Sequence, residues 1–191
     1  MSRRSHVLQL LDAYVPTREE QAYLDEMVAL ASGTDVPFSR DHFVPGHFTA
    51  SGFVVSPDGA ALLLVHHRRL QRWLQPGGHI DPEDGDPVAA AAREVREETA
   101  VALAEPLPTE LFDIDVHAIP AARGEPAHAH FDLRYLFRAD NMAFEADDEV
   151  IAAAWVSIDQ IAAGWKDASV QRVAARLAAT GGTPRYRQNP L

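Results

Sequence analysis

The stretch from Pro76 to Val101, PGGHIDPEDGDPVAAAAREVREETAV, decides how the rest of this chain is interpreted. Asp86 is a suitable N-cap and Pro87 suits the first helical position, so the sequence predicts that a helix begins here. One face of that helix is narrow and mostly apolar, with small or apolar residues recurring at helical spacing. These residues are Val88, Ala91, Ala92, Val95 and Thr99.

A second face of the same helix carries three carboxylates. Glu94, Glu97 and Glu98 stand at positions i, i+3 and i+4, so they are neighbours one turn apart. Anionic groups held so close repel one another unless a cation lies between them, and oxygen donors suit a hard ion such as Mg²⁺ or Mn²⁺. A row of glutamates is more often a solvated surface, so the wider sequence context has to decide between the two interpretations.

That context is an ordered set of two glycines, an acidic loop, a capped helix and Arg-Glu-x-x-Glu-Glu. The set resembles the Nudix box, the signature of the Nudix hydrolase superfamily and its MutT-like members. The box reads Gly, five residues, Glu, seven residues, then Arg-Glu-apolar-x-Glu-Glu-x-Gly-apolar. The matching residues are Gly78, Arg93, Glu94, Val95, Glu97, Glu98 and Val101.

The chain departs from this pattern at three places. Asp84 stands where the pattern has its first Glu, with Glu83 as the alternative if the loop shifts. The spacing from there to Arg93 is one residue longer than in the pattern. Ala100 replaces the last glycine, so the helix is expected to end without the usual left-handed glycine.

The resemblance implies the Nudix fold and hydrolysis of a nucleoside diphosphate linked to another group, by attack of water on phosphorus. It further implies that Glu94, Glu97 and Glu98 hold one or more Mg²⁺ ions, with Mn²⁺ as an alternative, and that Glu97 or Glu94 is the general base. Arg93 is expected to fix a glutamate rotamer. Gly78 is expected to let the backbone approach the metal or phosphate.

Several further positions are candidates for substrate recognition, each with a simpler structural alternative. Arg72 precedes the box and is placed to meet a phosphate, although arginines there are usually surface residues. Glu149 lies in an acidic loop whose counterpart in many Nudix enzymes supplies a site carboxylate, and it is the loop candidate for the base. His128 and His130 share one face of an expected strand, but no third nitrogen or sulfur ligand is evident. We therefore interpret them as pocket residues, with His130 or Asp132 as the candidate substrate contact.

The element order predicts an α/β fold, an α/β/α sandwich with a mixed β-sheet between helices. The expected domains are an N-terminal helical extension (1–45), a Nudix hydrolase domain (46–180) and a flexible tail (181–191). We expect the extension to dock on the core, with a dimer interface or a cover over the site as alternatives. Helices are expected at 5–14, from Thr17 to Ser32-Gly33 and at 168–179, and strands at 48–56, 60–67, 111–119, 128–138 and 152–158.

Composition limits the partners. The chain has 191 residues and a formal net charge of −11, which disfavours bulk nucleic acid. It has no cysteine, which excludes disulfides and thiolate metal sites. The N-terminus is too polar for a signal peptide and no stretch reaches transmembrane length, so a cytoplasmic protein without a membrane partner is expected. Homodimer formation is left open.

The expected partner is a small nucleoside diphosphate derivative: a nucleotide sugar, ADP-ribose, a dinucleoside polyphosphate or a modified nucleoside triphosphate. The alternative from another class is a non-catalytic Nudix-like module that senses nucleotides or acts as an adaptor. Such modules usually lose box carboxylates, whereas this chain keeps Glu94, Glu97, Glu98 and Arg93. Catalysis is therefore the favoured interpretation.

Overall fold

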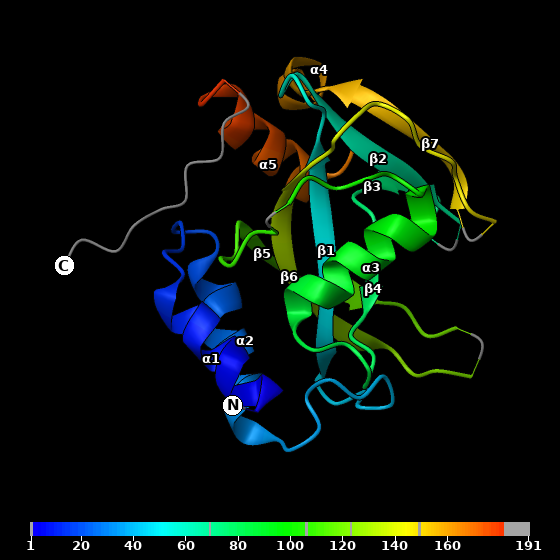
Figure 1. The fold of residues 1–191 in the computed structure, drawn as a ribbon. Helices are drawn as coiled ribbons and strands as arrows, with labels where there is room; N and C mark the ends of the chain where they lie inside the picture. The colour runs from blue at the N-terminus through cyan, green and yellow to red at the C-terminus, as the bar shows by residue number, and fades with distance from the viewer. Residues whose placement is uncertain (1, 69, 106, 123, 149, 182–191) are drawn as a thin grey trace.

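The computed structural model of the chain describes residues 2–68, 70–105, 107–122, 124–148 and 150–181, in which helices cover both faces of one seven-stranded sheet (Figure 1). The strands are β1 (Gly46–Val55), β2 (Ala61–His67), β3 (Arg72–Leu74), β4 (Gly77–His79), β5 (Asp113–Ile119), β6 (His128–Arg138) and β7 (Val150–Ser157). The helices are α1 (Arg3–Ala13), α2 (Gln21–Gly33), α3 (Pro87–Thr99), α4 (Ile158–Ala163) and α5 (Ala168–Ala178).

Strand β1 occupies the centre of the sheet. It pairs in parallel with β6 and antiparallel with β2 and β4, while β5 pairs with β6 and both β3 and β7 pair with β2. The register sets His47 beside His130 and Thr49 beside Asp132, and Thr49 also faces His79 of β4. Because alternate side chains point to the same face, this register gathers a row of polar side chains on one face of the sheet.

Two core clusters lie on the two faces of the sheet. Phe48 of β1 belongs to the cluster that includes Val95 of α3 and the buried residues of α1 and α2. Phe53, five positions later on β1 and so on the opposite face, belongs to the cluster that includes Val173 of α5. Helices therefore bury both faces of the sheet, and the predicted α/β/α sandwich with a mixed sheet is confirmed.

The N-terminal helices pack on the core, as expected. Val7, Leu11 and Met27 are buried and share the core cluster that α3 covers. Thr17 and Glu20 exchange the hydrogen bonds of a capping box, at 2.6 Å from Thr17 N–H to Glu20 Oε2 and 3.2 Å from Glu20 N–H to Thr17 Oγ1. The box closes a turn, and the regular helix begins only at Gln21, later than predicted.

The other predicted elements agree with the structure to within a few residues. Strands β3 and β4 were not predicted, because three-residue strands rich in glycine and arginine carry no periodic pattern. Among the described helices, none combines the length and apolar character that a membrane span requires. The expected tail begins at Gly181 and otherwise lies outside the described residues. The division into domains at residues 45 and 180 stays a prediction.

Candidate functional site

Helix α3 presents the carboxylates, and both of its ends are capped. Asp86 Oδ1 accepts a hydrogen bond from Ala89 N–H at 2.8 Å, and Pro87 is the first helical residue, as predicted. At the other end Ala100 adopts the left-handed conformation with a φ of 51°. We expected this geometry to be lost with the glycine, but alanine keeps it, at a cost of roughly 1–2 kcal/mol.

Asp84 occupies the first acidic position of the box. Its two carboxylate oxygens accept hydrogen bonds from Arg93, at 3.1 Å from Nε and 2.9 Å from Nη2, whereas Glu83 is exposed. Asp84 Oδ2 also accepts from Asp81 N–H at 2.8 Å, which closes the loop. Burial opposes ionisation of Asp84, but the hydrogen bonds from Arg93 and Asp81 N–H, together with the charges of Arg93 and Arg3, hold the pKa of this carboxyl below its usual range. The extra loop residue is therefore absorbed without losing the ion pair.

The Arg93 guanidinium is the cation between the box glutamates. Its Nη1 lies 2.9 Å from Glu94 Oε1 and 2.7 Å from Glu97 Oε2. Its Nη2 donates to the carbonyl oxygen of His79 at 2.9 Å, so the same side chain ties α3 to β4. The predicted role of Arg93 in fixing a glutamate rotamer is consistent with these contacts and extends to two glutamates.

Gly78 is the residue that Glu94 packs against. A Cβ atom at position 78 would lie 2.7 Å from Cδ and from both carboxylate oxygens of Glu94, so only glycine leaves that space open. The Glu94 side chain is 16% exposed, and burial raises the pKa of its carboxyl to about 6. A raised pKa means that the negative charge of Glu94 is incompletely compensated where it stands.

Glu98 faces the glycine segment from the same helix. It is buried, and its Oε2 accepts a hydrogen bond from Gly77 N–H at 3.1 Å. Among the described residues, the group placed closely enough to hold an ion is a trio of histidines, whose ligand atoms lie within 4.8 Å of one another, and not the three box glutamates. Arg93 brings Glu94 and Glu97 together, while Glu98 holds the loop.

This donor set fits a hard divalent cation. Glu94, Glu97 and Glu98 offer only carboxylate oxygens, which is the chemistry that Mg²⁺ and Mn²⁺ prefer. The carboxylate of Glu94 is buried with its charge incompletely compensated, so a cation there would stabilise its ionised form. The three predicted metal ligands therefore have the chemistry that the resemblance requires.

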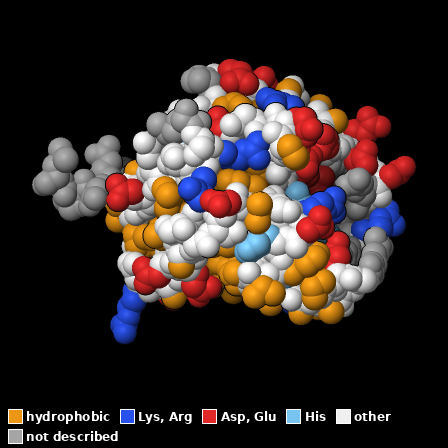
Figure 2. Space-filling model, turned by 90° about the horizontal axis from the view of Figure 1, so that it is seen from below, with side chains coloured by type: hydrophobic (Ala, Val, Ile, Leu, Met, Phe, Trp, Pro, Cys, Tyr) orange, Lys and Arg blue, Asp and Glu red, His pale blue; other side chains and the backbone are white. Residues whose placement is uncertain are grey.

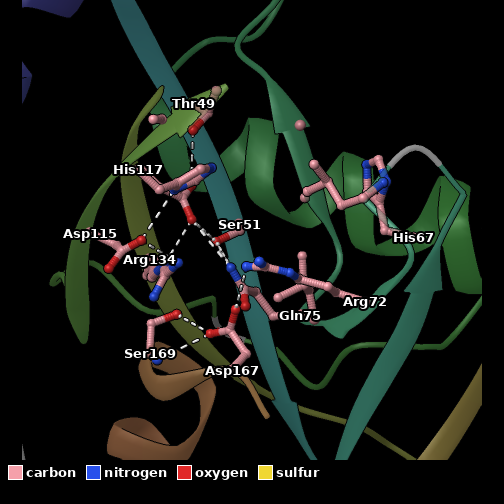
Figure 3. A pocket seen from close by; sticks show the side chains of 16 residues that line it. Thr49, Ser51, His67, Arg72, Gln75, Asp115, His117, Arg134, Asp167 and Ser169 are labelled. Atoms are coloured by element: carbon pink, nitrogen blue, oxygen red, sulfur yellow. Dashed lines mark hydrogen bonds and ion pairs between the residues drawn. The ribbon is translucent and has the colours of Figure 1, made fainter. Parts of the chain in front are cut away.

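A cavity of about 170 Å³ adjoins the glycine segment (Figure 3). Gly77 and Gly78 form part of its wall, and through them it is next to Glu98 and Glu94. Strands β1, β5 and β6 supply the polar floor, and the start of α5 closes one side. The polar residues that line it include Thr49, Ser51, Gln75, Asp132, Arg134 and Asp167.

Asp132 organises the floor of this cavity. Its carboxylate accepts from Thr49 Oγ1 at 3.1 Å, from Ser51 Oγ at 2.7 Å and from Gln75 Nε2 at 3.3 Å. Because the Gln75 amide nitrogen faces these acceptors, its Oε1 is left buried with no hydrogen-bond partner among the described residues. The cavity thus offers a fixed acceptor to an N–H or O–H donor of a ligand.

Arg134 also belongs to this floor; it is only 2% exposed and has three acidic partners. It contacts Asp132 at 2.8 Å, Asp115 at 3.1 Å and Asp113 at 3.2 Å. Burial alone would raise the pKa of Asp115, but Arg134, His117 and Arg172 together lower that pKa to about 2. Sequence reasoning missed this network. The sequence pattern that could have revealed the network is the alternation of acidic residues in 113–115 and of Asp132 with Arg134. Without knowledge of how the two strands pair, this pattern is indistinguishable from that of a solvent-exposed strand face.

Only some of the predicted substrate-binding residues line the cavity. Arg72 lines the cavity and pairs with Asp167 at 3.7 Å, and Gly78 lines it too. His130 is not among the lining residues and lies in a histidine cluster beside it. Glu149 lies outside the described residues. The roles of these four residues in binding substrate stay predictions.

Comparisons with known proteins bear on the family and on the fold. The sequence profile of the NUDIX domain matches residues 46–177. A C. elegans Ap4A hydrolase, solved as a binary complex, is similar in structure with a TM-score of 0.52 and 18% identity, covering 70% of this chain and 96% of that one. The E. coli dihydroneopterin triphosphate pyrophosphohydrolase has a TM-score of 0.51 and 16% identity, with coverage of 70% and 95%. No curated protein matches the chain. Identities this low show a shared fold.

Proposed function

The chain belongs to the NUDIX domain family of pyrophosphohydrolases, and we propose that it cleaves the diphosphate linkage of a nucleoside diphosphate derivative with Mg²⁺ as cofactor. The observation that carries this proposal is the arrangement of Glu94 and Glu97 around Arg93, beside the glycine segment that lines the cavity. A phosphate chain passing from the cavity over Gly77 and Gly78 would meet those carboxylates.

Glu94, Glu97 and Glu98 would hold the divalent ion, with Mn²⁺ as the alternative to Mg²⁺. A bound ion of this kind neutralises phosphate charge and lowers the pKa of a coordinated water. Glu97 or Glu94 takes the proton of the attacking water. Arg93 keeps both carboxylates oriented, and the hydrogen bond from Gly77 to Glu98 fixes the loop on which the phosphates would lie.

The cavity suggests that different parts of the substrate bind at different places. Its volume of about 170 Å³ is below the 300 Å³ or more typical of a whole-ligand pocket, so it would hold one moiety. Asp115 and Asp132 make the floor acidic, which suits the hydroxyl or amino groups of a sugar or base better than phosphate. Arg72 at the rim is the candidate phosphate contact. Nucleotide sugars, ADP-ribose, dinucleoside polyphosphates and modified nucleoside triphosphates all share this layout.

The test compares wild type with Glu97→Gln across those substrate classes, following phosphate or nucleotide release with and without Mg²⁺. We expect Glu97→Gln to lower kcat/KM by at least about a hundredfold, because it removes a carboxylate from the charge-stabilising group. The fold should stay intact, since the Glu97 side chain is 59% exposed. Glu83→Gln, an exposed change within the same segment, is the matched control and should leave turnover unchanged.

Near-normal turnover of Glu97→Gln would contradict the assignment of the box glutamates. A wild-type protein that neither binds Mg²⁺ nor cleaves any substrate class would instead support the sensor or adaptor interpretation. A cytoplasmic location and the lack of a bulk nucleic-acid partner stay predictions from the sequence, and homodimer formation stays open.

A further inference from the structure

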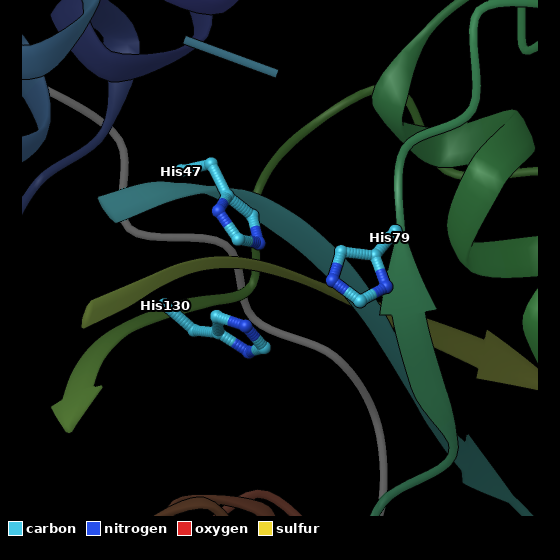
Figure 4. A group of neighbouring side chains, drawn as sticks. All are labelled: His47, His79 and His130. Carbon is cyan, nitrogen blue, oxygen red and sulfur yellow. The ribbon is translucent and has the colours of Figure 1, made fainter. Parts of the chain in front are cut away.

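Five histidines gather on the sheet face that carries the cavity, and one of them, His117, also lines the cavity. His47, His79 and His130 form its inner trio, with ring centroids 4.8 to 5.4 Å apart (Figure 4). One imidazole nitrogen from each of the three lies within 4.8 Å of the others. His128 and His117 flank this trio, at 5.2 and 5.6 Å from the ring of His130. The trio comes from three strands, so the sheet register fixes it.

His47 is preorganised to offer a lone pair. Its ring is fully buried, and Nδ1 lies 3.3 Å from the carbonyl oxygen of His42. A carbonyl can only accept, so Nδ1 carries the proton and Nε2 has the lone pair. Nε2 is buried and has no hydrogen-bond partner among the described residues. A buried acceptor without a partner is unfavourable in a protein interior, and a bound ligand would explain it.

A second hydrogen bond orients the neighbouring ring in the same way. His128 Nδ1 lies 2.8 Å from the carbonyl oxygen of Pro126, so it is the donor there. The lone pair of His128 Nε2 therefore faces Nε2 of His130 at 3.3 Å. Histidines that ligate metals usually have their second ring nitrogen fixed by such a carbonyl or polar partner.

The trio is neutral and partly accessible. Burial lowers the pKa of His79 to about 4 and that of His130 to about 2, and it also lowers that of His47. Neutral imidazole is the ligating form. His79 and His130 are only partly buried, and the face drawn in Figure 2 shows histidine side chains reaching the surface. An ion therefore has a route to the trio.

We propose that His47, His79 and His130 form a transition-metal site for Zn²⁺, separate from the carboxylates of the box. Imidazole nitrogen suits Zn²⁺ and other late transition metals, whereas Mg²⁺ prefers oxygen, so the two donor sets select different ions. Ligands 2.0–2.1 Å from a tetrahedral Zn²⁺ lie about 3.3–3.4 Å apart. The ligand atoms of the trio lie within 4.8 Å of one another, so they close in by up to about 1.4 Å on binding. Three ligands leave a fourth position for water or a neighbouring group.

The test is calorimetric titration of the full chain, after removal of metals by chelation, with Zn²⁺ in buffer without Mg²⁺. We expect one Zn²⁺ per chain. We expect Zn²⁺ affinity to fall by more than about a hundredfold in His130→Asn and in His79→Asn, because removing a group that only hydrogen-bonds to a metal ligand already lowers affinity 10–100-fold. Co²⁺ should report the same site through its visible absorption. Circular dichroism checks folding, and if one variant fails to fold the other decides.

Two controls separate this site from others. His6→Asn, on helix α1, should leave Zn²⁺ affinity unchanged. The double variant Glu94→Gln, Glu97→Gln should also keep Zn²⁺ binding while weakening that of Mg²⁺. The proposal is overturned if wild type does not bind Zn²⁺, if folded His79→Asn and His130→Asn bind it as tightly as wild type, or if only the glutamate variant loses it.

Discussion

At the residue scale, Gly78 and Glu94 show how a backbone position controls a carboxylate. The first glycine of the box was expected to bring backbone close to a ligand, and the structure shows that it also makes room for Glu94. In Gly78→Ala the new Cβ would overlap the Glu94 carboxylate, which is the flexible end of its side chain and can move away. We expect kcat to fall about 10- to 100-fold, since displacements near 1 Å cost that much.

The same change should cost little stability, less than about 1 kcal/mol of unfolding free energy, because the displaced group is a side-chain end. Urea denaturation measures this, and Gly85→Ala is the matched control, since no atom lies within 4 Å of its added Cβ. A drop in stability with unchanged kcat would show that Gly78 serves the fold and not the carboxylate.

At the residue scale, the sequence groups candidate site residues only where they lie within one short segment. Glu94, Glu97 and Glu98 were grouped together because a helix brings positions i, i+3 and i+4 side by side, and their role as metal ligands stays a prediction. The trio of His47, His79 and His130 could not be found this way, since its members come from three strands and meet only through register. The sequence shows only His128 and His130 on one strand face. The strand pairing that brings His47 and His79 beside them cannot be read from it.

At the scale of elements, the N-terminal helix α1 touches the box directly. Arg3 Nη2 donates to the carbonyl oxygen of Pro82 at 2.9 Å and also to that of Asp84, whose side chain pairs with Arg93. The sequence left the role of this extension open, because no pattern in residues 1–45 indicates which part of the chain it contacts. The contact spans about eighty positions of the chain, which is beyond any local pattern.

This contact predicts a measurable effect on the box loop. Arg3→Gln should speed hydrogen exchange at the amides of Asp81 and Asp84, which are protected by bonds within the loop of 2.8 and 3.1 Å. It should cost about 1 kcal/mol of stability, as expected for lost hydrogen bonds. Arg4→Gln is the control, since Arg4 contacts Thr34 and Asp35 instead. Equal exchange in both variants would mean that α1 does not support the loop.

At the scale of the whole molecule, a buried ionic network connects three layers. Arg134 of β6 holds Asp113 and Asp115 of β5, and Arg172 of α5 contacts Asp113 at 2.8 Å and Glu20, next to α2, at 3.8 Å. Removing one partner of such a group leaves a buried charge without compensation. The network therefore couples the cavity floor to the global stability of the fold.

The network also predicts how stability depends on pH. The pKa of Asp115 is lowered to about 2 in the folded protein, against about 3.9 in an unfolded chain, so its ionised form stabilises the fold above pH 4. That contribution, roughly 2–3 kcal/mol, is lost as pH falls from about 4 to 2. Burial raises the pKa of Asp113, which acts in the opposite sense and makes the measured slope shallower.

The difference in unfolding free energy between wild type and Asp115→Asn isolates this contribution from other carboxyls. We expect a difference that is constant above pH 4 and shrinks toward pH 2, because protonation of Asp115 removes the charge that the variant lacks. Asp12→Asn, an exposed change on α1, should show no such trend. A difference independent of pH between 2 and 4 would mean that the Arg134 cluster holds Asp115 by packing and not by its charge.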